Sequence, residues 1–366
     1  MVVPEMIFEK FTAKIPIIQG GMGVRVSMAP LAAAVANQGG IGTLSCLGLG
    51  GLDAPKDLFE KLSLDALEAE IHKAFSMITD GHLAVNIMGV ISNAYDMVKT
   101  SVLAGIKIIV FGAGLPMKLP SVVEDPDVNL FPIISSARVA DIILKGWDNR
   151  HGVTADALIL EGPLAGGHLG FSPEQLDHID DFKLEKLLGE VLEKIKFYED
   201  KYGRKIPVIA AGGIYTGSDI GRMLSLGASG VQMGTRFVCT DECNVSDEFK
   251  KEYLDAKQED IVIVQSPVGL PGRAIRNKFI KALEKGEKMK FKCPFKCLTA
   301  CQISKAKYCI AEVLLNSYFG DVDHGLVFCG ANAWRVNKIV SVKKLIGELM
   351  DELKTYKPEN QLAVSF

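Results

Sequence analysis

Eight short apolar runs rich in β-branched residues recur between Ile15 and Met233, and they constrain the fold more than any other feature of the chain. The runs are mostly apolar rather than regularly alternating, which is typical of strands in a parallel sheet covered on both faces. They are Ile15–Ile18, Ile41–Ser45, Leu83–Ile87, Ile106–Phe111, Phe131–Ile134, Ala155–Leu160, Ile206–Ala210 and Ser229–Met233.

Segments with helical patterns lie between these runs. Ser27–Asn37 is expected to be a helix with Ser27 as its N-cap and Gly39 just after its end. Gly217–Ser225 is a second such segment, and Leu184–Tyr202 has apolar residues at helical spacing with charges on the opposite face. Eight strands that alternate with helices predict an α/β fold, a (β/α)8 TIM barrel; an open doubly wound sheet is the alternative.

Two parts of the chain depart from this alternation. Residues 46–80 form a long and partly helical connection after the second run. From Cys239 onward the strand-like runs give way to helical patterns and a cysteine-rich turn region. We therefore expect a barrel over residues 1–238, a mostly helical, cysteine-containing extension packed on the barrel over 239–340, and a C-terminal helix and tail over 341–366.

Charge and hydropathy exclude several classes of partner. The formal net charge of −3 gives no electrostatic footprint for nucleic acid. No apolar run reaches the ~18 residues of a membrane span, and the first residues lack the charged start and long apolar core of a signal peptide. The sequence thus predicts a cytoplasmic protein with a small-molecule substrate and no nucleic-acid or membrane partner, and it is compatible with a homodimer.

Glycine-rich loops follow several runs, at the strand ends where barrels of this kind place their active sites. Gly212 and Gly213 follow the seventh run, and Gly234 with Thr235 follows the eighth. Barrels often bind phosphate here through backbone amides, whereas tight turns are the alternative reading. Because both loops follow candidate strands, we favour phosphate. Further glycine-rich loops follow the first and sixth runs. Together with the phosphate site, they suggest that the ligand is a flavin mononucleotide (FMN).

The stretch LEGPLAGGHLGF, residues 160–171, follows the sixth run and places His168 between Gly166–Gly167 and Gly170. These glycines disfavour a helix, so the sequence predicts a strand that ends in a loop presenting an imidazole. A structural histidine that only caps this loop is the alternative.

The chain contains five informative motifs, PIIQGGMG, VNIMG, EGPLAGGHLG, IPVIAAGGI and GASGVQMGTRF. Together they resemble the nitronate monooxygenase (2-nitropropane dioxygenase) family of FMN-dependent barrels. That family includes FMN-dependent enoyl-acyl-carrier-protein reductases. The resemblance covers about residues 15–239 and reaches more weakly to GLVFCGANAWR near the C-terminus. It implies that His168 is catalytic and faces the substrate side of the flavin. The FMN-binding residues that it implies are Gly21, Met22, Gly23, Asn86, Glu161, Gly166, Gly167, Ala211, Gly212, Gly213, Gln232, Gly234 and Thr235.

Two reactions fit this resemblance. In the one we favour from the sequence, His168 is the base that removes the proton next to a nitro group, and oxidation of the nitronate by oxygen yields a carbonyl compound and nitrite. In the alternative, NAD(P)H is the reductant for an enoyl thioester, and His168 orients or polarises the thioester carbonyl. A flavin-binding barrel without turnover is a weaker alternative, because a binding module has no need of a glycine-framed base.

Four cysteines are spaced C-x3-C-x3-C-x7-C at Cys293, Cys297, Cys301 and Cys309. They are candidates for zinc or an iron–sulfur cluster, although the spacing matches neither the paired C-x2-C zinc pattern nor the ferredoxin run. On a helix the first three would share a face. Buried reduced thiols are the alternative, so the sequence leaves the metal unknown.

Overall fold

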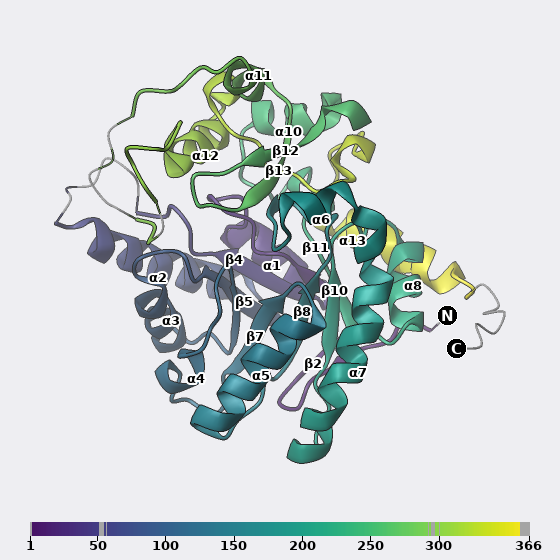
Figure 1. The fold of residues 1–366 in the computed structure, drawn as a ribbon. Coiled ribbons are helices and arrows are strands. Elements are labelled where there is room, and N and C mark those ends of the chain that lie inside the picture. Colours follow the sequence, from purple (N-terminus) through teal and green to yellow (C-terminus); the bar gives the residue numbers. More distant parts are fainter. Residues whose placement is uncertain are drawn as a thin grey trace.

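A closed barrel of eight parallel strands forms the centre of the computed structural model, which describes residues 2–50, 55, 57–291, 293, 297–299 and 301–358 (Figure 1). The strand order around the barrel is β3-β4-β5-β6-β7-β8-β10-β11. These strands are β3 Ile17–Gln19, β4 Ile41–Ser45, β5 His82–Met88, β6 Ile108–Gly112, β7 Asn129–Ile134, β8 Leu158–Glu161, β10 Val208–Ala211 and β11 Gly230–Met233. The predicted TIM barrel is confirmed, and each of the eight apolar runs overlaps one barrel strand.

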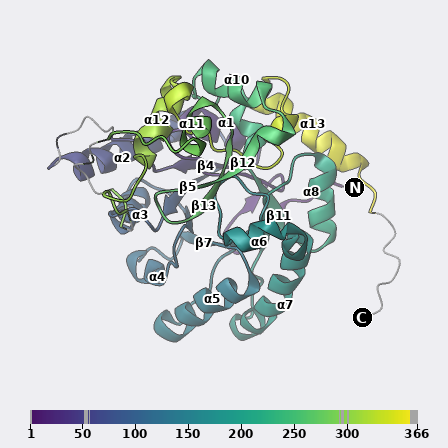
Figure 2. The same ribbon diagram turned by 45° about the horizontal axis from the view of Figure 1, so that its top comes forward.

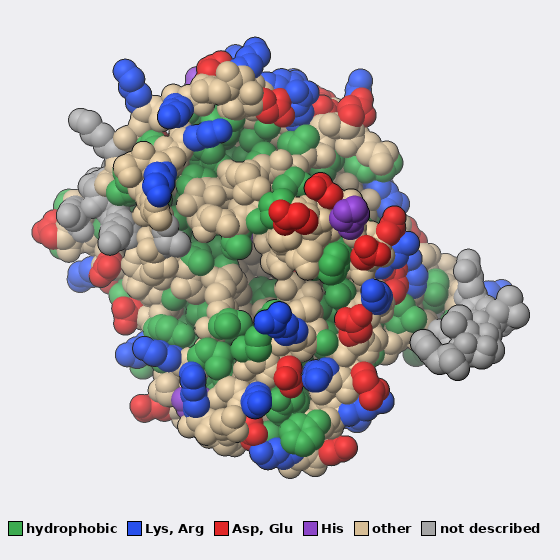
Figure 3. Space-filling view, viewed as in Figure 1, with side chains coloured by type: hydrophobic (Ala, Val, Ile, Leu, Met, Phe, Trp, Pro, Cys, Tyr) green, Lys and Arg blue, Asp and Glu red, His purple; other side chains and the backbone are tan. Residues whose placement is uncertain are grey.

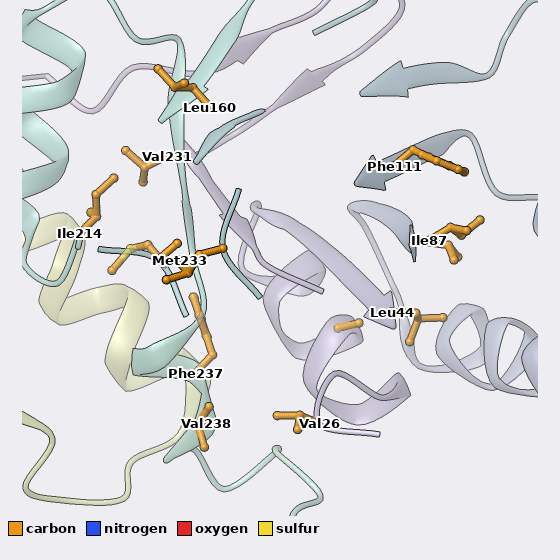
Figure 4. Close-up of a cluster of buried hydrophobic side chains, with 14 of the residues drawn as sticks. Val26, Leu44, Ile87, Phe111, Leu160, Ile214, Val231, Met233, Phe237 and Val238 are labelled. Carbon is orange, nitrogen blue, oxygen red and sulfur yellow. The ribbon is translucent and has the colours of Figure 1, made fainter. Parts of the chain in front are cut away.

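Side chains of the strands point alternately into and out of the barrel, and both layers are apolar. The inner layer includes Ile18, Phe131 and Ile209 and continues to the N-terminal hairpin of β1 (Met6–Ile7) and β2 (Thr12–Ala13). The Phe8 ring stacks on Phe131 with centroids 5.1 Å apart, which closes the amino end of the barrel. The outer layer packs against the helices; Figure 4 shows part of it, with Leu44, Ile87, Phe111, Leu160 and Val231.

The helices between the strands include three that the sequence predicts. They are α1 Ala29–Asn37, α2 Phe59–Met77, α3 Ala94–Leu103, α4 Leu119–Val122, α5 Ala137–His151, α6 Pro173–Asp177, η1 Ile179–Phe182, α7 Leu184–Tyr202 and α8 Gly217–Ser225. The bounds of α7 and α8 are those expected, and α2 lies in the long connection after β4. None of the helices in the described ranges is long and apolar enough to cross a membrane.

The predicted N-cap of the first helix is wrong. The cap residue of α1 is Met28, and Pro30 lies in the first turn, where its missing amide costs nothing. The Ser27 hydroxyl is already used within the preceding loop: it accepts a hydrogen bond from the Met22 amide (2.9 Å) and lies 2.7 Å from Gln19 Nε2. A serine committed to the loop in this way cannot also cap the helix.

The last helix, α13 (Val342–Thr355), packs between α8 and α1 and so occupies the eighth helix position of the barrel (Figure 2). Two glycines of α8 permit this close approach. A Cβ at Gly217 would lie 2.3 Å from the Leu349 carbonyl oxygen, and one at Gly221 would lie 2.4 Å from the Tyr356 ring. The chain therefore leaves the barrel after the short helix α9 (Thr235–Val238) and returns to complete it with α13.

The described residues between 239 and 341, here called the cap, lie over the carboxyl ends of the strands (Figure 1). Alongside its helices the cap has an antiparallel hairpin, which the expectation of a mostly helical extension did not foresee. Its elements are α10 Asp247–Asp255, η2 Gln258–Asp260, β12 Ile261–Gln265, β13 Pro271–Ile275, α11 Lys278–Glu284, α12 Ile310–Phe319, η3 Val322–His324 and η4 Ala333–Arg335.

The loop after the sixth barrel strand joins this cap hairpin. Its short strand β9 (Gly167–His168) pairs antiparallel with β13, with His168 opposite Gly272 and Gly167 opposite Arg273. The Arg273 side chain, 4% exposed, donates a hydrogen bond to the Ala165 carbonyl. The glycine-framed histidine therefore lies in a three-stranded cap sheet, not in an unsupported loop.

Candidate active site

A cavity of about 250 Å³ lies between the carboxyl ends of the barrel strands and the cap. The molecular face in Figure 3 is hollowed near its centre, below the cap. All fourteen residues predicted from the sequence line this cavity, and they come from the ends of five barrel strands. They are Gly21, Met22, Gly23, Asn86, Glu161, Gly166, Gly167, His168, Ala211, Gly212, Gly213, Gln232, Gly234 and Thr235.

The loops after β10 and β11 expose backbone amides to the cavity. Gly212 and Gly213 have φ angles of 97° and 81°, a region that favours glycine. A Cβ at Gly212 would also lie 2.9 Å from the Gly162 carbonyl oxygen. Within the described residues, the amides of Gly213 and Gly234 donate no hydrogen bond. Free amides on adjacent strands form a suitable cradle for an anion such as phosphate.

Two amide side chains, those of Asn86 and Gln232, also line the cavity. Asn86 on β5 lies against Gly21, where a Cβ would approach the Asn86 Cβ to 2.2 Å. Gln232 on β11 has its side-chain oxygen Oε1 buried without a hydrogen-bond partner among the described residues. An orphaned buried acceptor costs stability unless a ligand supplies a donor. The amide cradle and these side chains fit the phosphate and heterocycle of FMN.

Glu161 ends β8 and lines the cavity without a side-chain hydrogen bond to any described residue. Burial raises the pKa of this carboxyl group to about 7, because the charged form loses its hydration. The carboxyl group of Glu161, which lines the cavity, thus has a pKa close to neutral pH.

His168 is held by two residues of the cap. Its Nε2 lies 2.7 Å from Ser266 Oγ. The Phe328 ring packs edge-on against the imidazole, with centroids 4.9 Å apart and planes at 70°. Burial lowers the pKa of His168 to about 4, so the imidazole is uncharged at neutral pH.

Several cap residues that the sequence analysis did not assign complete the cavity wall. Residues 328–332 all line it, and two of them contact the amide cradle. The Gly330 amide donates to Thr235 Oγ1 (3.2 Å), and the Asn332 side-chain amide donates to the Gly213 carbonyl (2.7 Å). The one sequence signal for this segment was the weak family resemblance of GLVFCGANAWR.

The four spaced cysteines lie near one another, but the structure does not support the metal site considered from the sequence. No group of three or more His, Cys, Asp or Glu side chains that could hold a metal occurs in the part of the chain that the structure describes, which includes all four. A helix that would place the first three on one face is not observed among the described residues, and α12 begins after Cys309. Instead Leu298 forms a β-bridge with Ile91, and the Ser92 amide donates to the Cys297 carbonyl (3.0 Å).

The fold and the site together define a (β/α)8 barrel with an amide cradle and a histidine at the carboxyl ends of its strands. Residues 5–352 match the family model described as nitronate monooxygenase. The chain belongs to the nitronate monooxygenase family.

Two curated relatives and one solved structure show the range of proteins similar to this chain. A Mycobacterium tuberculosis protein named (3aS,4S,5R,7aS)-5-hydroxy-7a-methyl-1-oxo-octahydro-1H-indene-4-carboxyl-CoA dehydrogenase is 32% identical over 273 residues, 75% of this chain and 66% of that protein. The chain thus spans slightly less than two thirds of that relative. A probable nitronate monooxygenase of Staphylococcus saprophyticus is 27% identical over 303 residues, 73% of this chain and 77% of that protein. FabK from Thermotoga maritima has a TM-score of 0.72 and 28% identity, with 93% of each chain covered.

Proposed function

We propose that this chain is an FMN-dependent oxidoreductase. The observation that carries the proposal is the convergence of three features on one cavity: free amides at Gly213 and Gly234, the orphaned oxygen of Gln232, and the imidazole of His168. The two amides would hold the phosphate, and Asn86 and Gln232 would hold the heterocycle. FMN, when bound, would supply the redox chemistry, whereas the protein supplies position and electrostatics.

We further propose an acyl thioester as the substrate. The Mycobacterium tuberculosis relative is named for a CoA thioester, and the cap adds apolar residues to the cavity, among them Leu314, Leu326 and Phe328. These side chains suit an acyl group. His168 would donate a hydrogen bond to the thioester carbonyl oxygen and stabilise the negative charge that develops there. In the reductive direction, NAD(P)H gives up a hydride, and the enoyl thioester takes up that hydride and a proton.

Oxidation of a nitroalkane or nitronate is the second candidate. It is supported by the family and by the uncharged state of His168 at neutral pH. A neutral imidazole can accept the proton from the carbon next to the nitro group. The nitronate anion formed beside it would then favour the protonated imidazole by Coulomb attraction.

Purified protein distinguishes these proposals in two steps. A yellow protein that releases FMN on denaturation supports the cofactor, whereas a colourless protein that takes up no FMN contradicts it. For the loaded protein, NAD(P)H should bleach the flavin under anaerobic conditions, and an enoyl-CoA should restore the colour. Oxygen consumption with a nitronate in the absence of NAD(P)H would favour the second candidate instead. Binding of FMN without turnover in either assay would identify a flavin-binding barrel.

A further inference from the structure

The hydrogen bond between His168 and Ser266 joins residues 98 positions apart in the chain. Ser266 follows β12 and begins the hairpin turn to β13. This turn is closed by bonds from the Ser266 amide to the Leu270 carbonyl (3.1 Å) and from the Gly269 amide to the Ser266 carbonyl (2.9 Å). Ser266 is only 7% exposed, and unlike His168 it does not line the cavity. Ser266 therefore contacts the imidazole from the cap and does not itself face the cavity.

The direction of this hydrogen bond follows from the other partner of the hydroxyl. Ser266 Oγ already accepts a hydrogen bond from the Val268 amide (3.4 Å). Its proton has one acceptor within reach among the described residues, His168 Nε2 at 2.7 Å. If Nε2 carried the proton instead, the hydroxyl proton of a buried serine would be left without a partner, which is unfavourable. The hydroxyl therefore donates, and Nε2 accepts.

We propose that Ser266 is the positioning residue of His168 and holds the neutral imidazole in the tautomer with its proton on Nδ1. An imidazole whose Nε2 lone pair is occupied has its proton on the other nitrogen. Nδ1 has no hydrogen-bond partner among the described residues, so its N–H is available to a ligand in the cavity.

A second contact fixes the plane of the ring. Phe328 packs edge-on against the imidazole, and a Cβ at Gly272 would lie 2.8 Å from Phe328 Cε1, so the glycine makes room for this ring. Gly272 is also the strand partner of His168. Backbone, aromatic ring and hydroxyl thus restrain the imidazole from three sides, which limits both its rotation and its choice of tautomer.

This tautomer deepens the proposed function, and its catalytic consequence rests on that proposal. An Nδ1–H group donates a hydrogen bond to a carbonyl oxygen, as the thioester reaction requires. Removal of a carbon-bound proton would require an unprotonated nitrogen facing the cavity, and thus a turned Ser266 hydroxyl that accepts from Nε2–H. The resting arrangement therefore favours polarisation of a carbonyl over deprotonation of a nitroalkane.

The tautomer can be measured without any turnover. In protein labelled with 15N-histidine, the resonances of His168 are assigned by their loss in His168→Gln. At neutral pH we expect Nε2 at the shift of an unprotonated imidazole nitrogen and Nδ1 at that of a protonated one. A protonated Nε2 in the wild-type protein would overturn the proposal, and this result needs no variant of Ser266.

Variants of Ser266 then separate positioning from a structural role. Ser266→Ala should give a mixture of tautomers and reduce kcat by about tenfold, the equivalent of one lost hydrogen bond, with FMN affinity unchanged. Ser266→Thr keeps the hydroxyl and should retain the single tautomer and the kcat of the wild-type protein. The matched control is Ser76→Ala, which removes an exposed hydroxyl bonded to the Lys73 carbonyl. If Ser266→Ala kept a single Nδ1–H tautomer, another group would be responsible. A chain that binds no FMN would refute the proposed function while leaving the tautomer measurement valid.

Discussion

Asn332 donates a hydrogen bond from its side-chain amide to the carbonyl oxygen of Gly213 at 2.7 Å and so ties the cap to the amide cradle after β10. Gly213 follows the seventh barrel strand, whereas Asn332 lies 119 residues later. Gly213, which has a φ of 81°, lines the cavity, and the bond from Asn332 restrains its conformation from the cap side. The proposed anion site is therefore shared between barrel and cap.

Replacement of Asn332 should weaken FMN binding. Asn332→Ala removes one hydrogen bond of about 1 kcal/mol and frees the Gly213 loop, so the dissociation constant of FMN is expected to rise by about five- to tenfold. Titration of the apoprotein, followed by quenching of flavin fluorescence, measures this change. Asn316→Ala, which removes a hydrogen bond to the His324 carbonyl in the cap, is the control and should leave FMN affinity unaltered.

Gly212→Ala should destabilise the cradle itself. The φ of 97° and the 2.9 Å approach to the Gly162 carbonyl oxygen both oppose a side chain, at a cost of about 1–3 kcal/mol for the backbone conformation alone. We expect a lower melting temperature and loss of FMN binding. Gly189→Ala on α7 is the matched control, because nothing lies within 4 Å of its added Cβ. This change should stabilise the protein by about 0.5–1 kcal/mol, and equal behaviour of the two variants would contradict the role of Gly212.

The pKa of His168 gives a directional pH test. Because it is lowered from 6.5 to about 4 in the folded protein, the uncharged imidazole persists well below neutral pH. As the pH falls, the unfolded chain binds this proton at a higher pH than the folded chain does. The contribution of the buried neutral imidazole to the free energy of unfolding is therefore present above pH 6.5 and is lost as the pH falls toward 4. Melting temperatures of wild type and His168→Gln should therefore converge in acid. In assays, His168→Gln should lower kcat by about 10²-fold or more, with the flavin still bound.

Ionisation of Glu161 should make FMN affinity fall as the pH rises through neutrality. Its pKa of about 7 means that the carboxyl group ionises as the pH rises through neutrality, and a bound FMN would bury that charge further. We expect affinity to fall by several-fold between about pH 6 and pH 8, a dependence that Glu161→Gln should abolish. Glu190→Gln, on the exposed face of α7, should retain the dependence of the wild type. A flat profile in the wild-type protein would refute this role of the carboxyl group.

Local pattern was sufficient to predict the barrel because each strand is a self-contained signal. All eight apolar runs overlap a strand, and the helix over Leu184–Tyr202 was predicted to the residue from its spacing. The position of α13 in the barrel was not predictable in this way. Its packing depends on Gly217 and Gly221 of α8, more than a hundred residues earlier, and a glycine pair does not indicate its distant partner.

The residues of the candidate site also divide into those that local pattern predicts and those that depend on distant contacts. Residues at strand ends, such as Gly212 and Thr235, were predicted because the fold fixes where strand ends meet. The cap residues Ser266, Phe328 and Asn332 were not assigned, since their relevance arises from contacts with loops that are distant in the sequence. The spacing of the four cysteines pointed to a metal, but the nearness of Cys293, Cys301 and Cys309 to Cys297 does not by itself arrange a coordination site among the described residues.

The placement of His168 in a sheet with β13 has a consequence for how the protein matures. The ribosome releases all eight barrel strands before the hairpin that pairs with β9. A nascent chain at that stage has its glycine loops, but its imidazole has neither a strand neighbour nor the serine hydroxyl that orients it. The surroundings of the imidazole can thus be completed only after the cap hairpin has been made, so the site is assembled late in synthesis.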